Sequence, residues 1–133
     1  MASELRVNTL KDAAGNNSVA LSTVAEGSAK AWAHVAAGGA SLPDSFNFSS
    51  IDDDGTGEYG LNYTSAMGSA NYSANGTITF NHTSGANNVR VLLTESKSTS
   101  SVEIDSGYTN ASGVYIEYDI ETNASVTVQG DLA

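Results

Sequence analysis

The sequence predicts an all-β protein, an antiparallel β-sandwich or jelly-roll-like domain preceded by a small hairpin or extended attachment segment. Three observations support this prediction. Apolar and polar residues alternate in short runs, the runs recur about every 8–12 residues, and Gly, Asn, Asp and Ser fill the intervals. We expect two parts, an N-terminal segment with its linker over residues 1–44 and a β-domain over residues 45–133.

Residues 4–23 predict a first hairpin. Its turn lies at residues 12–17, and the apolar positions of its two strands are Leu5, Val7, Val19 and Leu21, followed by Thr23 in the same alternation. A two-stranded ribbon with such a thin apolar face is marginal by itself in water. We therefore expect it to pack against another subunit, with Leu5 and Val7 as contact residues.

Residues 25–39 fit two structures. Their alanine content favours a helix, which Gly27 and the glycines at 38–39 would limit to a few turns. The alternation of Lys30, Trp32 and His34 with small residues favours an extended chain. We expect the extended form, with Trp32, the single tryptophan, as an apolar contact between subunits and residues 36–43 as a linker.

The chain is organised around residues 45–72. Phe46 and Phe48 alternate in a first expected strand, and Tyr59, Leu61 and Tyr63 alternate in a second. The connection at residues 52–57, DDDGTG, is rich in residues that favour turns. This stretch therefore predicts a β-hairpin.

Five later runs predict further strands, at residues 77–83, 89–95, 102–105, 114–120 and 125–129. The run at 114–120 is the most regular, because every second residue from Val114 to Ile120 is apolar. Polar loops are expected at residues 96–101 and 106–113. We expect the second loop to expose Tyr108 and Asn110, whose side chains offer stacking and hydrogen bonding for receptor recognition.

The composition predicts association of identical chains. Leu, Ile, Val and Phe total 26 of 133 residues and the net charge is −10, a combination close to that of disordered chains. The strand periodicity is nevertheless regular, so we expect a homo-oligomer whose subunits bury apolar surface against one another. The acidity, concentrated in residues 45–133, disfavours nucleic-acid and anionic-membrane partners.

The sequence carries no cysteine, so disulfides and thiolate metal sites are excluded. Its start, MASELR, lacks the basic and apolar regions of a signal peptide, and the chain has no apolar run of 18 residues. We therefore expect synthesis in a cytoplasm and no membrane insertion.

Candidate chemistry is sparse. Residues 55–60 match GxGxxG, but a β-alternating run follows and the neighbouring acids would repel phosphate, so we expect no cofactor. Asp52, Asp54 and Glu58 suggest at most a weak calcium site, because an EF-hand loop starting at Asp52 would end on Tyr63 rather than glutamate. No nucleophile, base and orienting group can be proposed together, so we do not expect an enzyme.

Several segments resemble fibre proteins of tailed bacteriophages, especially those of aquatic bacteria. The segments are SELRVNTLKD at 3–12, AKAW at 29–32, SFNFSSI at 45–51, NYT at 62–64, AM at 66–67, ANY at 70–72 and VTVQG at 126–130. The resemblance implies a virion structural protein, made in the host cytoplasm. It also implies a homotrimer whose residues 1–44 attach to another virion protein and whose tip meets the host surface.

Trimerisation would let weak contacts with a host-surface glycan act together. Two alternatives to a tail or head fibre stay open. One is a capsid decoration or cement protein without a receptor, and the other is a free β-module that binds carbohydrate or calcium.

Overall fold

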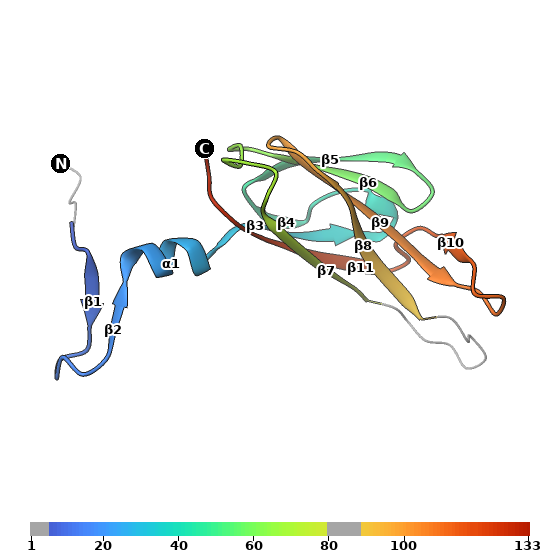
Figure 1. Ribbon diagram of the computed structural model, residues 1–133. Coiled ribbons are helices and arrows are strands. Elements are labelled where there is room, and N and C mark those ends of the chain that lie inside the picture. The colour runs from blue at the N-terminus through green and yellow to red at the C-terminus, as the bar shows by residue number, and fades with distance from the viewer. Residues whose placement is uncertain (1–5, 80–88) are drawn as a thin grey trace.

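The computed structural model describes residues 6–79 and 89–133, and most of them lie in antiparallel strands. The all-β prediction is confirmed. Figure 1 shows an N-terminal ribbon and helix that extend away from a β-domain. The elements are β1 (Thr9–Lys11), β2 (Ser18–Ala20), α1 (Leu21–Gly27), β3 (Ala29–Ala36), the short helical turn η1 (Ala37–Gly39), β4 (Asp44–Phe46), β5 (Phe48–Gly55), β6 (Glu58–Tyr63), β7 (Ser73–Thr79), β8 (Arg90–Lys97), β9 (Ser101–Thr109), β10 (Tyr115–Glu117) and β11 (Asn123–Gln129).

The N-terminal ribbon is shorter than the sequence predicts. Asp12 holds its turn, because the Asn17 side chain donates a hydrogen bond of 2.7 Å to the Asp12 carboxylate. The predicted continuation of the second strand through Leu21 and Thr23 is wrong, since the chain forms α1 there. The pairing of β2 with β1 ends at Ala20, so the residues that follow have no partner strand. A helix lets them pair their backbone groups with one another. None of the described residues of α1 is buried.

β3 lies inside a four-stranded antiparallel sheet with the order β4-β3-β11-β7. The extended interpretation is therefore confirmed for residues 29–36, but it is wrong for residues 25–27, which form the end of α1. The inward side chains of the two central strands are Ala31, Ala33, Val35, Ala124, Val126 and Val128. β3 pairs with β11 along its length, so residues 29–36 of the predicted N-terminal segment lie in a sheet of the β-domain. Below, the N-terminal part means the described residues 6–28, up to the end of α1.

The second sheet is organised around β9. One edge of β9 pairs with β8, while the other pairs with β6 at residues 101–105 and with β10 at residues 107–109. β5 completes the sheet beyond β6, so the predicted central hairpin corresponds to β5 and β6. Tyr59, Leu61 and Tyr63 share a buried face, as predicted.

The chain passes from the first sheet to the second at Asn47, between β4 and β5. Its φ is 59°, and its side-chain oxygen accepts a 2.7 Å hydrogen bond from the Ser65 amide. Phe46 therefore ends β4 with 51% exposure, whereas Phe48 begins β5 with 6%. The prediction that both share one face of one strand is wrong, because alternation assumes an extended backbone at every residue.

Three later strands differ from their predicted bounds. β9 continues to Thr109, which shortens the loop predicted at residues 106–113. The strand predicted at 114–120 is reduced to β10, because β6 already occupies the rest of that edge of β9. The strand predicted at 77–83 corresponds to β7, and residues 80–83 lie outside the described part of the chain.

A polar junction separates β6 from β10 along β9. The buried Ser106 donates its amide to the Gly57 carbonyl at 2.8 Å, and its own carbonyl accepts the Tyr118 amide at 2.9 Å. The Asp119 carboxylate accepts hydrogen bonds from the Gly57 amide at 2.8 Å and the Tyr59 hydroxyl at 3.3 Å. The change of partner strand thus leaves these buried groups paired.

One apolar cluster unites residues of both sheets. Phe48 stacks on Tyr63 with ring centres 5.0 Å apart, and Tyr72 meets Tyr63 edge-on at 5.8 Å. The β-domain therefore has an apolar core within one chain, although the composition predicts that apolar surface is buried between subunits. Tyrosine and alanine, which a count of Leu, Ile, Val and Phe leaves out, supply much of this core.

Replacing Gly57 tests the junction. Gly57 has φ 82°, and a Cβ there would lie 2.4 Å from the Ser106 carbonyl oxygen, whereas Gly113 has φ 77° and open space around it. We expect Gly57→Ala to lower the free energy of unfolding by about 3 kcal/mol or more, against about 1 kcal/mol for Gly113→Ala, which bears only the backbone cost. Urea unfolding measures both, and equal losses would contradict a rigid junction.

Candidate functional site

Tyr108, a predicted recognition residue, lies on β9 rather than in a loop. The guanidinium carbon of Arg90 lies 4.6 Å from the centre of the Tyr108 ring and 3.9 Å from that of Tyr118. Arg90 also donates a hydrogen bond of 3.1 Å to Glu121. A cation between two rings is a stabilising contact, so Tyr108 helps to hold β8 to the segment after β10.

Asn110 shapes the turn that follows β9. Its side-chain oxygen accepts hydrogen bonds from the Ser112 amide at 2.9 Å and the Val114 amide at 3.0 Å. These contacts occupy the Asn110 side-chain oxygen, which the sequence predicts to face a ligand. Receptor binding by Tyr108 and Asn110 stays a prediction, and the structure gives each residue an internal role.

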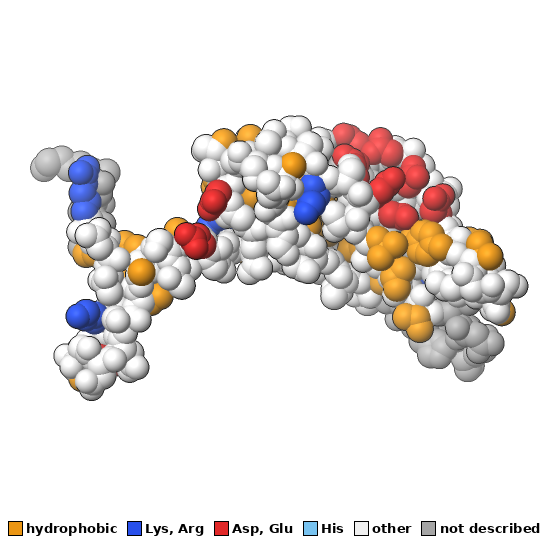
Figure 2. Space-filling model, in the orientation of Figure 1, with side chains coloured by type: hydrophobic (Ala, Val, Ile, Leu, Met, Phe, Trp, Pro, Cys, Tyr) orange, Lys and Arg blue, Asp and Glu red, His pale blue; other side chains and the backbone are white. Residues whose placement is uncertain are grey.

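The outer face of the second sheet is acidic. Figure 2 shows acidic side chains gathered over the region of β5, β6 and β9, with hydrophobic side chains beside them. The carboxylates of Glu103 and Asp54 both lie close to Gly60. A Cβ on Gly60 would lie 2.9 Å from the Glu103 carboxylate and 3.1 Å from that of Asp54, so a glycine leaves room for both. The Tyr115 hydroxyl donates a hydrogen bond of 2.9 Å to Asp105 on the same face.

Among the residues that the structure describes, no group of three or more His, Asp or Glu side chains could hold a metal ion, and the weak calcium site at Asp52, Asp54 and Glu58 stays a prediction. Asp52 accepts a hydrogen bond of 2.7 Å from the Asn62 side chain. Asp54 and Glu58 lie on β5 and β6 respectively. The GxGxxG motif likewise forms the end of β5, its turn and the start of β6, with no helix following.

The outer face of the first sheet carries two exposed aromatic side chains. Trp32 on β3 is directly opposite Phe46 on β4, with exposures of 38% and 51%. The register continues from Trp32 to Thr127 on β11 and Asn75 on β7. A row across four strands therefore begins with two rings and ends with two polar, uncharged side chains.

A shallow hollow adjoins this row. It has a volume of about 160 Å³ and is lined by Asn75, Gly76, Thr77, Ser125 and Thr127. Hydroxyl and amide groups of β7 and β11 therefore face the solvent beside the rings. The row and the hollow form one surface, which we call the aromatic face.

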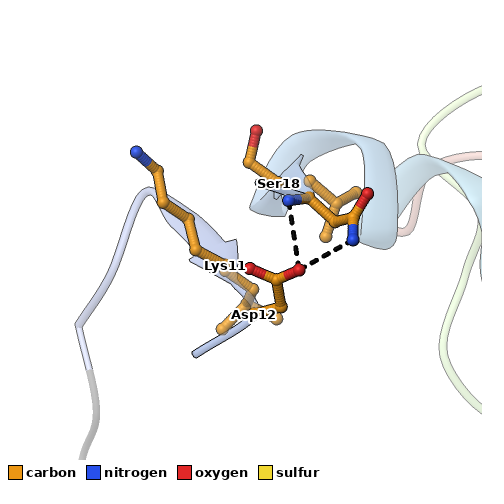
Figure 3. Close-up of a pocket in the computed structure, with 6 residues that line it drawn as sticks. Lys11, Asp12 and Ser18 are labelled. Carbon is orange, nitrogen blue, oxygen red and sulfur yellow. Dashed lines mark hydrogen bonds between the residues drawn. The ribbon is translucent and has the colours of Figure 1, made fainter. Parts of the chain in front are cut away.

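The N-terminal ribbon has a concavity of its own, with a volume of about 320 Å³. Figure 3 shows Lys11, Asp12 and Ser18 at this concavity, with Asp12 bonded within the turn. Val7 is half-buried, and Leu5 lies outside the described residues. Contacts of Leu5, Val7 and Trp32 with other subunits stay predictions.

Sequence reasoning missed two contacts, the pairing of Phe46 with Trp32 and the stack of Arg90 on Tyr118. Alternation in residues 29–36 does indicate the face on which Trp32 lies. Its neighbour on that face depends on the register between β3 and β4, which no local pattern encodes. The Arg90 stack likewise depends on how β8 and β10 both pair with β9.

Neutralising Glu103 tests the repulsion on the acidic face. Burial raises the pKa of Glu103, and the carboxylates of Asp54, Glu95 and Asp52 raise it further, against one hydrogen bond from a serine hydroxyl. A carboxyl with a higher pKa in the folded state destabilises the fold once it ionises. Glu103→Gln should therefore raise stability at pH 7, and this gain should vanish as the pH falls through the ordinary pKa of 4.5.

Urea midpoints at several pH values measure this gain. Glu26→Gln, which removes a carboxylate from α1 instead, is the matched control and should show no comparable gain. A Glu103→Gln midpoint unchanged at pH 7 would contradict the repulsion.

Comparisons with known proteins do not identify the chain. No helix among the described residues is long and apolar enough to cross a membrane. No protein-family model, curated protein or solved structure matches the sequence or the fold.

Proposed function

We propose that the chain is a structural protein of a tailed-bacteriophage virion, one subunit of a trimeric tail or head fibre that contacts the host cell surface. In this proposal the β-domain is a jelly-roll-like sandwich, in which the two main sheets enclose the apolar cluster. The sequence resemblance of short segments between residues 3 and 130, most specific over residues 30–72, supports the assignment to fibres.

One structural observation carries the proposal: the described residues 6–28 form no buried core. Leu10 and Val24 are 44% and 43% exposed, and no described residue of α1 is buried. Two strands of three residues and a seven-residue helix are too short to be stable alone in water. Packing between three copies would cover these side chains and stabilise the segment.

The two parts of the chain then have separate tasks. The β-domain has its own core, so it can stand exposed at the end of the particle. The N-terminal part joins the copies and attaches them to another virion protein. Three identical tips would bind a host-surface glycan with an avidity that one weak site lacks.

Electron microscopy of virus particles with a labelled antibody against the chain tests the assignment. We expect the label on a projection from the tail or head. Label distributed over the capsid shell would instead support a decoration protein. Absence from the particles would contradict both assignments.

Sedimentation equilibrium tests the trimer and its contacts. We expect a mass three times the 13.6 kDa of one chain at micromolar concentration. The double variant L10S/V24S should weaken association by about tenfold or more, because it removes apolar side chains that the copies bury.

Leu93→Ser is the matched control, since Leu93 is 47% exposed but lies on β8. The control should keep the wild-type mass. A single-chain mass for the wild type, or equal weakening in both variants, would contradict the proposed assembly.

A further inference from the structure

We propose that the aromatic face binds a neutral carbohydrate chain. The inference names the receptor class for the proposed fibre and rests on that function for its biological setting. The binding itself depends only on the surface formed by β4, β3, β11 and β7.

Trp32 and Phe46 form the stacking part of the site. They are opposite each other in an antiparallel pair, where side chains on one face lie about 5 Å apart. Trp32 stays 38% exposed and Phe46 51% exposed, although Ala31 and Ala33 on the inner face of β3 are buried. Sugar rings present C–H groups on their faces, and these pack on exposed aromatic rings while the sugar hydroxyls stay solvated.

Polar groups beside the rings supply hydrogen bonds. Thr127 is directly opposite Trp32 on the next strand, and Asn75 follows Thr127 on β7. Three strand spacings of about 4.8 Å make the row roughly 14 Å long, enough for a short oligosaccharide. The Asn75 amide and the Thr127 hydroxyl also line the shallow hollow, where they can donate and accept hydrogen bonds.

The charge of this face favours a neutral ligand. The ionisable side chains on the described outer face of its strands are Lys30, His34 and Asp44. The Lys30 ammonium is held by the Ala25 carbonyl and the Ser28 hydroxyl. The carboxylates of β5, β6 and β9 lie on the other sheet, so a cationic ligand would prefer that face and an anionic one would gain little here.

A second copy of the chain is the rival occupant of this face, as the sequence predicted for Trp32. Interface centres are rich in apolar and aromatic residues and poor in serine. Here only two rings stand among Asn75, Thr77, Ser125 and Thr127. This mixture of rings and uncharged polar groups suits a sugar better than another protein surface.

The single tryptophan makes the site directly observable. The 133-residue chain is titrated with cellohexaose, laminarihexaose, mannohexaose and maltoheptaose, and with polygalacturonate as a charged comparison, while its tryptophan emission is recorded. We expect a saturable change in emission with at least one neutral oligosaccharide and none with polygalacturonate.

Variants are compared by electrophoresis in gels that contain the corresponding soluble polysaccharide. Trp32→Ala and Phe46→Ala should each weaken binding about tenfold or more, as expected for loss of a stacking ring, and Trp32→Tyr should recover much of it. Leu93→Ala, which removes an exposed apolar side chain from the other sheet, should bind like the wild type.

Two results would overturn the inference. One is no emission change with any neutral oligosaccharide. The other is a fall in sedimentation mass for Trp32→Ala without a loss of sugar binding, which would assign the face to a second copy. A chain that binds sugar through Trp32 but is absent from virus particles would refute the proposed function and leave this inference standing.

Discussion

The architecture of the β-domain depends on one change of partner along β9. β6 occupies the first part of one edge and β10 the last, and Ser106 lies between them with its backbone bonded to Gly57 and Tyr118. Asp119 ties the same point to the start of β6. An edge can be shared in this way only if no buried donor or acceptor is left unpaired at the transition. The same pairing leaves no room for a side chain at residue 57, because a Cβ on Gly57 would lie 2.4 Å from the Ser106 carbonyl oxygen.

The two sheets turn different chemistry toward the solvent. The outer face of the second sheet crowds carboxylates over Gly60, and three consecutive aspartates lie on its edge strand β5. Charge on an edge strand discourages pairing with another chain, so it restricts association to other surfaces. The aromatic face of the first sheet has little charge and two exposed rings. A single chain thus combines a repellent surface with one suited to recognition.

Stability is distributed unequally along the chain. The β-domain encloses its own apolar cluster, whereas the described N-terminal part exposes Leu10 and Val24 and buries no α1 side chain. Local stability follows buried apolar contacts, so the N-terminal part lies at the low end of the range. Association would therefore matter most to the ribbon and helix and least to the β-domain.

The sequence by itself determined the all-β class, the alternation of side chains along β3 and β6 and the acidity of the domain, because alternation and composition are local properties. The sheet change at Asn47, the division of the β9 edge and the opposition of Trp32 and Phe46 were decided only by the tertiary structure. The predicted site residues show the same limit. The chemistry of Tyr108 and Asn110 predicts recognition, whereas in the structure Tyr108 stacks with Arg90 and Asn110 shapes a turn. Register between distant strands is set by how the whole set of side chains packs, so a short stretch of sequence does not encode it.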